Sequence, residues 1–425
     1  MIRRALLLSL LFGPAMAEPE AGHHHHDHGA QPHEEAAAPT VSPEIFKEFQ
    51  AIEALAANSA YGDAERKVRE LLPRLEDNPA AKALLLRNLA TLYGLQKRYA
   101  RAAETLDQAL ALHALPAADA GKTRQEQGQY YLAAEEYPKA AEAFAAWIAE
   151  ASAPAPEQFL LLADLKTQLK QYPEAAVWVE KAIAASPAPK PEWRQRLLGL
   201  HHEMRDFRNC AKVLSTLIEQ SPDDARYWQQ LTGIYQEAGQ EAQALAVQQL
   251  MHARGLLKSS EDIVQLAQVL RYRNMPTRAA ELLQREIGGG RLEASVRNME
   301  LLADAWTEAR ELGKAAAALE KAAAQTNAGD TYHRLGQLYS EQHDWAKARQ
   351  SLARALERGG LKNPGGAWLL LGLAEYRLDA RPEAREAFVK ALDMPAVRKS
   401  AQQWLEHIDR ESRQEQGSGR RENRG

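Results

Sequence analysis

The 425-residue chain is poor in the residues that build several common kinds of protein. It has one cysteine, Cys210, so no disulfide can form within a single polypeptide. Aromatic residues make up 7% of the sequence, and runs of β-branched residues, which favour strands, are few. The formal net charge of −4 argues against nucleic acid as a partner, because such proteins carry an excess of positive charge. No stretch after the N-terminal segment is apolar enough to cross a membrane.

The sequence also lacks the short motifs that mark common active sites. It contains no HExxH zinc motif, no GxSxG nucleophile elbow and no GxxxxGK[ST] phosphate loop. The run Gly288-Gly289-Gly290 is read as a connector between helices. We therefore expect a protein that is not an enzyme and that requires no cofactor.

Alanine, leucine, glutamate and glutamine are abundant, and their spacing indicates paired helices. The clearest unit is Tyr332–Arg358, where apolar residues recur every three or four positions on either side of a short break. Gly336 in the first half and Ala348 in the second half are small, as required where two helix axes come close. This arrangement is the helix–turn–helix pattern of a tetratricopeptide repeat.

The same unit recurs along most of the sequence at a spacing close to the period of about 34 residues of these repeats. The first-helix crossing positions are Ala90, Gly128, Ala163, Leu198, Thr232, Ala267, Ala303, Gly336 and Gly372. The second-helix crossing positions are Ala102, Ala140, Ala175, Cys210, Ala244, Ala279, Ala315, Ala348 and Ala384. The prediction is an all-α fold: a right-handed α-solenoid of about ten tetratricopeptide-type helix pairs over residues 42–395. A capping helix over residues 396–413 and a disordered tail over residues 414–425 follow.

The N-terminus has the features of a cleavable signal peptide over residues 1–17. Arg3 and Arg4 precede an apolar run, and Ala15-Met16-Ala17 supplies the small residues that signal peptidase requires. The mature protein then begins near Glu18 with no cysteine for lipid attachment. We expect a periplasmic protein without a membrane span in its mature form.

Residues 18–41 form a low-complexity leader that is rich in histidine and predicted to be disordered. Its candidate metal ligands are His23, His24, His25, His26, His28 and His33. Imidazole suits zinc, copper and nickel, so the leader is a candidate site for such a divalent metal. The alternative interpretation is a polar linker without a metal.

Partner binding is expected on the concave face formed by the first helices, at positions 5 and 9 of each repeat. The candidate residues are Gln129, Asp164, Gln195, Gln229, Gln268, Asp304 and Gln337. No repeat has the pairing of lysine and asparagine that carboxylate-clamp tetratricopeptide proteins use to hold a peptide C-terminus. An amide-rich face suits hydrogen bonding to an extended peptide or to a helix. An ordinary solvated surface remains the alternative at any single glutamine.

Residues Gly121–Arg413 also contain less generic segments. They include Gly128-Gln129-Tyr130-Tyr131, Ala143–Ile148, Trp193–Leu200, Arg205-Asp206-Phe207, Tyr227–Leu231, Gly255-Leu256-Leu257 and Gln403-Trp404-Leu405. In these segments the protein resembles periplasmic tetratricopeptide repeat proteins associated with TonB–ExbB–ExbD energy-transduction systems. The resemblance implies a non-enzymatic accessory scaffold that docks on the periplasmic regions of TonB, ExbB or ExbD and supports outer-membrane import. It does not extend to the histidine-rich leader.

Two other functions stay open from the sequence. One is an adaptor for another envelope machine of export or assembly, such as polysaccharide export. The other is a periplasmic adaptor for zinc, copper or nickel handling, in which the leader binds metal while the repeats dock a transporter.

Overall fold

The computed structural model describes residues 42–422, with side chains over residues 42–413. Within this range every regular element is helical, which confirms the predicted all-α class. The protein divides into two compact units, Met1–Glu219 and Gln220–Gly425. The predicted signal peptide and histidine-rich leader lie outside the described residues.

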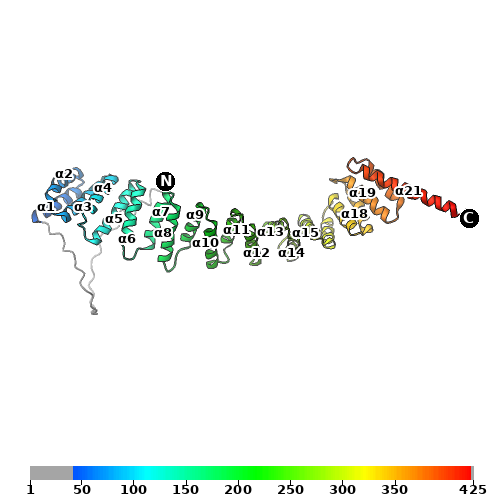
Figure 1. Ribbon diagram of the computed structural model, residues 1–425, viewed down its shortest axis with the longest axis horizontal. Coiled ribbons are helices and arrows are strands. Elements are labelled where there is room, and N and C mark those ends of the chain that lie inside the picture. The colour runs from blue at the N-terminus through cyan, green and yellow to red at the C-terminus, as the bar shows by residue number, and fades with distance from the viewer. Residues whose placement is uncertain (1–41, 423–425) are drawn as a thin grey trace, which may run out of the picture. The chain divides into compact units, whose positions relative to one another are not determined.

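The first unit contains five helix pairs, which Figure 1 shows side by side in sequence order. They are α1 (Pro43–Ala57) with α2 (Tyr61–Leu71), α3 (Pro79–Leu95) with α4 (Tyr99–Ala111), α5 (Ala117–Ala133) with α6 (Tyr137–Glu150), α7 (Pro156–Gln168) with α8 (Tyr172–Ala185), and α9 (Pro191–Glu203) with α10 (Phe207–Gln220). A 3₁₀ turn, η2 (Leu72–Leu75), follows α2. The backbone enters α1 through Ser42, whose hydroxyl accepts a hydrogen bond from the backbone N–H of Ile45 at 3.4 Å, as expected of an N-cap.

The second unit contains five more pairs and a final single helix. The pairs are α11 (Ala225–Glu237) with α12 (Glu241–Ala253), α13 (Ser260–Tyr272) with α14 (Pro276–Gly288), α15 (Val296–Glu308) with α16 (Leu312–Ala323), α17 (Gly329–Glu341) with α18 (Trp345–Arg358), and α19 (Pro364–Arg377) with α20 (Arg381–Leu392). The final helix is α21 (Arg398–Glu422). The described residues therefore form ten helix pairs, the number that the repeat pattern predicts.

Small residues lie where the two helices of a pair cross. All nine predicted second-helix positions are at most 4% exposed, including Cys210, whose thiol is buried. A Cβ atom on Gly336 would lie 2.6 Å from Cγ of Leu352, and one on Gly372 would lie 2.7 Å from Cε1 of Phe388. These separations leave no room for a side chain, so the crossings need the glycines that the sequence places there.

A turn of three residues joins the two helices of each pair. The middle residue of all ten turns has a positive φ angle. In the turn after α3, the N–H of Lys97 donates to the carbonyl of Gly94 at 2.9 Å, and that of Arg98 donates to Tyr93 at 2.8 Å. These bonds satisfy the last carbonyls of the helix, as in a Schellman motif. The turns hold the second helix of each pair against the first.

The C-terminal helix caps the last pair as predicted, but it is longer than expected. The indole of Trp404 stacks on Phe388 with ring centroids 5.7 Å apart, and Ile408 is 3% exposed in the same apolar cluster. We predicted a helix over residues 396–413 and a disordered tail over residues 414–425, whereas α21 continues to Glu422. The end of the helix therefore lies beyond residue 413, because a polar composition does not prevent a helix from propagating once packing has nucleated it.

Over the described part of the protein, none of the helices combines the length and the apolar character needed to cross a bilayer.

Candidate functional site

The seven candidate groove residues lie on successive first helices, α5, α7, α9, α11, α13, α15 and α17. Gln129 and Asp304 are half-buried, and the other five residues are exposed. The repeat pattern therefore places side chains in contact with solvent at these positions. Whether they contact a partner stays a prediction.

Both acidic residues of this set form ion pairs with the next first helix. Asp164 on α7 lies 2.7 Å from a guanidinium nitrogen of Arg196 on α9. Asp304 on α15 pairs in the same way with Arg334 on α17. The two aspartates therefore connect neighbouring repeats, in addition to any contact that they make with a partner.

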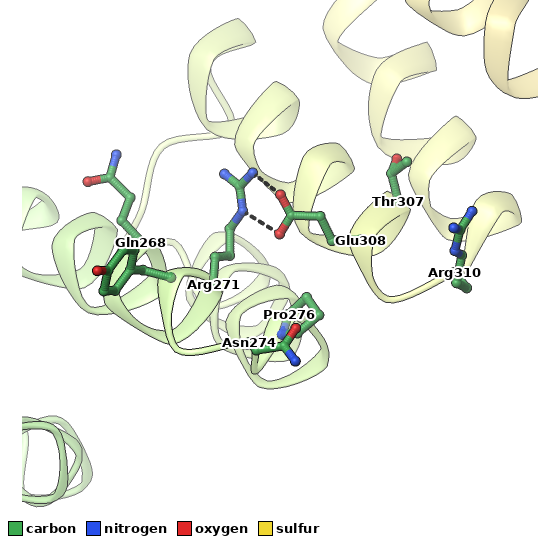
Figure 2. Close-up of a pocket in the computed structure, with 8 residues that line it drawn as sticks. Gln268, Arg271, Asn274, Pro276, Thr307, Glu308 and Arg310 are labelled. Carbon is green, nitrogen blue, oxygen red and sulfur yellow. Dashed lines mark hydrogen bonds and ion pairs between the residues drawn. The ribbon is translucent and has the colours of Figure 1, made fainter. Parts of the chain in front are cut away.

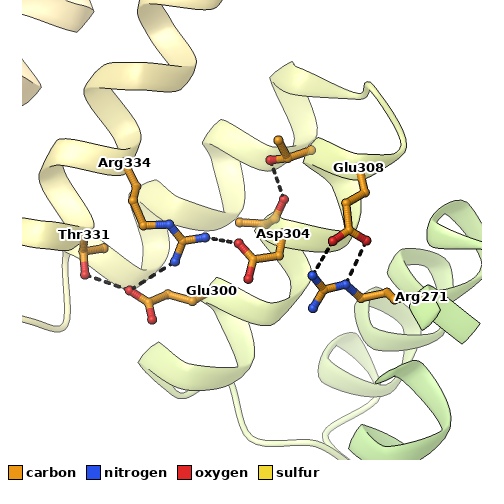
Figure 3. A network of polar contacts seen from close by, with 8 residues as sticks. Arg271, Glu300, Asp304, Glu308, Thr331 and Arg334 are labelled. Atoms are coloured by element: carbon orange, nitrogen blue, oxygen red, sulfur yellow. Dashed lines mark hydrogen bonds and ion pairs between the residues drawn. The ribbon is translucent and has the colours of Figure 1, made fainter. Parts of the chain in front are cut away.

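Figure 3 shows that the second of these contacts belongs to a network along α13, α15 and α17. Arg334 also lies 3.8 Å from Glu300, whose carboxylate accepts a hydrogen bond from the hydroxyl of Thr331 at 2.9 Å. On the other side of α15, Arg271 of α13 donates two hydrogen bonds to Glu308, one of them 3.0 Å long. The paired guanidinium and carboxylate planes hold these first helices in register.

Burial and ion pairing shift the carboxyl groups of this network in opposite directions. Burial raises the pKa of Asp304 above its ordinary value, and the nearby Arg334 guanidinium opposes that shift only in part. The hydrogen bonds from Arg271 lower the pKa of Glu308. The pKa of Asp164 is also raised, because neighbouring protein atoms displace part of the water around its exposed carboxylate, and Arg196 opposes this shift.

Sequence reasoning missed the basic members of these pairs and Glu308. A signal was present, because the partners lie close to one repeat period apart: residues 164 and 196, 304 and 334, and 271 and 308. Opposite charges at that offset on first helices predict contacts between repeats. Composition alone could not separate them from solvated charges.

Two pockets flank Gln268 on the α13–α15 side of the second unit. The larger, of about 680 Å³, is shown in Figure 2. Its lining residues are Gln268, Arg271, Tyr272, Asn274, Pro276, Thr307, Glu308 and Arg310. The other, of about 620 Å³, is lined by Ser260, Glu261, Val264, Gln265, Gln268, Leu292, Glu293, Ser295, Arg297 and Asn298. Both volumes are in the range of ligand-binding clefts, and Gln268 is the predicted groove residue common to the two.

The candidate metal ligands cannot be placed in the same way. The six histidines of the leader, from His23 to His33, lie outside the described residues. Among the side chains that the structure describes, residues 42–413, no group of three or more histidines, cysteines, aspartates or glutamates is arranged to hold a metal ion. The leader remains the candidate metal site.

Comparison with known proteins identifies the repeat. The family model described as tetratricopeptide repeat matches residues 333–400. Curated protein sequences yielded no match.

Solved structures similar to this protein include the following three. The crystal structure of MamA shares 24% identity at a TM-score of 0.31, covering 38% of this chain and 93% of that chain. A tetratricopeptide repeat protein from Parabacteroides merdae shares 17% identity at a TM-score of 0.31, covering 61% of this chain and 97% of that chain. YrrB, a tetratricopeptide repeat protein with an unusual peptide-binding site, shares 19% identity at a TM-score of 0.29, covering 42% and 88%. By its family match at residues 333–400 and by the helix pairs that recur through the other described residues, the protein is built from tetratricopeptide-type repeats.

Proposed function

We propose that this protein is a protein-interaction scaffold that binds an extended or helical polypeptide on its first-helix face. The observation that supports this function best is the recurrence of exposed amide side chains on first helices of one unit, Gln229, Gln268 and Gln337. Side-chain amides both donate and accept hydrogen bonds, so they match the backbone groups of a peptide. The ion pairs from α13 to α15 and from α15 to α17 connect the helices that carry Gln268 and Gln337.

We further propose that the scaffold works in the periplasm as an accessory component of a TonB–ExbB–ExbD system. The resemblance of residues Gly121–Arg413 supports this role, and the signal-peptide features of residues 1–17 support the location. The mechanism is non-enzymatic: the repeats hold the periplasmic region of a partner and keep it available for coupling to outer-membrane import.

Site-specific crosslinking in cells tests both statements. A photoreactive residue, p-benzoylphenylalanine, replaces Gln268 on α13 in one strain and Gln284 on α14 in another. Both glutamines are exposed and belong to the same repeat, but they lie on its first and second helix. Adducts with TonB, ExbB or ExbD from position 268 and not from position 284 support the proposal.

Other outcomes of this experiment contradict part or all of it. Adducts made only with polysaccharide-export or metal-transport proteins overturn the TonB role and leave the scaffold function in place. Equal adducts from the two positions contradict binding on the first-helix face.

Metal handling is a second candidate function, favoured by the six histidines of the leader. Deletion of residues 18–35 separates it from the plain scaffold. A metal-dependent growth defect with partner crosslinking intact supports zinc, copper or nickel handling, whereas normal growth across metal concentrations rules it out.

A further inference from the structure

The larger pocket beside Gln268 lies at the edge where the turns of two repeats meet, and we call it the turn-edge pocket. Seven of its eight lining residues come from the C-terminal ends of α13 and α15, the turns that follow them and the start of α14. Gln268 is the member that also belongs to the first-helix face. Apart from Gln268, the turn-edge pocket is therefore made of residues outside the row of amides on which the proposed scaffold function rests.

Rigid turns present two polar side chains to this pocket from equivalent places in neighbouring repeats. Asn274 and Arg310 are the middle residues of the turns after α13 and α15, with φ angles of 58° and 62°. The backbone N–H of Asn274 donates to Arg271 at 2.9 Å, and that of Arg310 donates to Thr307 at 3.0 Å. Because these bonds fix both backbones, the two side chains project from fixed Cβ positions.

One of the two arginines that line the pocket has a side-chain partner among the described residues, and the other has none. Arg271 and Glu308 are hydrogen-bonded to each other, and Figure 2 shows this pair between Gln268 and Arg310. Arg310 makes no ion pair or side-chain hydrogen bond with any residue in the described part of the protein. The lining carries two arginines and one glutamate, so the charge left after the internal pair is the single positive charge of Arg310. That charge is complementary to an anion.

An aromatic surface accompanies this charge. Tyr272 lines the pocket and is 84% exposed, the highest value among the large exposed apolar side chains of the described residues. Pro276 adds a second flat apolar surface to the lining. A tyrosine ring that is left in water gains by stacking on another ring or on a proline, which accounts for the enrichment of tyrosine at interfaces.

The dimensions of the cleft suit a peptide. The two pockets adjoin through Gln268, and together they follow α13 from Ser260 to Tyr272. Thirteen helical residues span about 20 Å, which equals about six residues of extended backbone. The amides of Gln268 and Asn274 can each bond to both groups of a peptide unit.

We propose that the turn-edge pocket binds a peptide segment in which a carboxylate lies next to a planar apolar side chain. The carboxylate docks on Arg310 and Asn274, and the planar side chain packs on Tyr272. Gln268 bonds the peptide backbone as it leaves toward the second pocket. The side chain of an aspartate or glutamate supplies the carboxylate.

Calorimetric titration of the full mature protein with short synthetic peptides tests this site. The probe is acetyl-Ala-Asp-Phe-Ala-amide, and its matched control has asparagine in place of aspartate. We expect the aspartate peptide to bind at least tenfold more tightly. A third peptide, acetyl-Ala-Ala-Phe with a free C-terminal carboxylate, tests the other source of a carboxylate: tight binding of this peptide without tight binding of the aspartate peptide overturns the proposal.

Protein variants then assign the contacts. Arg310→Gln is expected to weaken binding of the aspartate peptide about tenfold and to leave binding of the asparagine peptide unchanged. Arg310→Lys is expected to retain part of the preference for aspartate over asparagine. Tyr272→Ala is expected to remove the preference for phenylalanine over alanine in the peptide. Arg205→Gln is the matched control, because Arg205 is the middle residue of the turn after α9 and lies outside the pocket. The proposal is overturned if aspartate and asparagine peptides bind equally, or if Arg310→Gln and Arg205→Gln have the same effect.

Discussion

Glycine at the helix crossings is matched to the size of the residue that lies opposite. Gly128 and Gly372 each face a phenylalanine sixteen residues later, and an added Cβ would come within 2.9 Å of either ring. Where the opposite residue is leucine or valine, the crossing residue is mostly alanine, as in the pair Ala163 and Val179. The spacing of small residues is predictable from the sequence because this constraint is local and repeats with every helix pair.

Replacement of Gly128 by alanine is expected to lower the free energy of unfolding by about 1–3 kcal/mol, because the new methyl group overlaps Phe144. Gly199→Ala is the control. Gly199 is an exposed glycine inside α9 with no atom within 4 Å of its Cβ position, so alanine there should stabilise the helix by about 0.5–1 kcal/mol. Urea denaturation of both variants measures the two changes. Equal effects would show that the crossing has room for a side chain.

Tyrosine hydroxyls connect neighbouring repeats through partly buried hydrogen bonds. The hydroxyl of Tyr131 on α5 donates to the carboxylate of Asp107 on α4, and burial together with this bond raises the tyrosine pKa. Tyr131→Phe should therefore cost about 1.5–3 kcal/mol of stability, the contribution of a hydrogen bond to a charged group. Tyr272→Phe, at a hydroxyl in solvent, should change stability by less than about 0.5 kcal/mol. Thermal unfolding of the two variants provides the comparison, and a small effect at Tyr131 would mean that Gln127 alone satisfies Asp107.

At the scale of elements, the three-residue turns show what local sequence does not reveal. All ten middle residues adopt the left-handed conformation, yet only Gly239 is a glycine, and the others include Lys97, Glu135 and Arg310. Non-glycine residues tolerate this conformation here because the packing of both flanking helices determines the turn geometry. Turn residues could be located from the sequence, but their common conformation could not.

The cost of this conformation can be measured at two equivalent turns. Gly239→Ala should destabilise the protein by about 1 kcal/mol, because a Cβ atom is unfavourable at a φ of +69°. Lys170→Gly should stabilise it by about 0.5 kcal/mol. Glycine removes the steric cost of a Cβ atom at positive φ, and this gain exceeds the extra backbone entropy that glycine loses on folding. Both values come from chemical denaturation. Opposite signs are the expected result, and a loss in both variants would indicate that the Lys170 side chain makes a stabilising contact.

At the scale of the whole molecule, repetition made the fold more predictable than the site. The ten helix pairs, the buried Cys210 and the capping contact of Trp404 all follow from one period and its steric rules. Gln268 is a candidate site residue on the sequence alone, because its position recurs in every repeat. Tyr272 and Arg310 were not predicted as site residues, because side chains at the turns follow no repeating pattern. The pocket that they line forms only where residues of two adjacent repeats come together.

A buried histidine links the stability of the whole protein to pH. His333 on α17 is 6% exposed, and burial lowers its pKa, with the nearby Asp330 opposing the shift. Its pKa in the unfolded state is about 6.5, so between that pH and the lower folded pKa the unfolded state binds more protons. The contribution of neutral His333 to the free energy of unfolding is therefore fully present above about pH 6.5. It is lost as the pH falls through the pKa of the folded state.

The expected outcome is that His333→Gln flattens the fall in unfolding free energy between about pH 7.5 and pH 5.5, because glutamine does not titrate. Urea denaturation at a series of pH values measures the two slopes. His113→Gln, which removes an exposed imidazole in the first unit, serves as the control and should change the slope less. A His333→Gln curve parallel to that of the native protein would show that the imidazole gains water or a carboxylate partner on protonation. A steeper curve for the variant would contradict the assigned direction of the pKa shift.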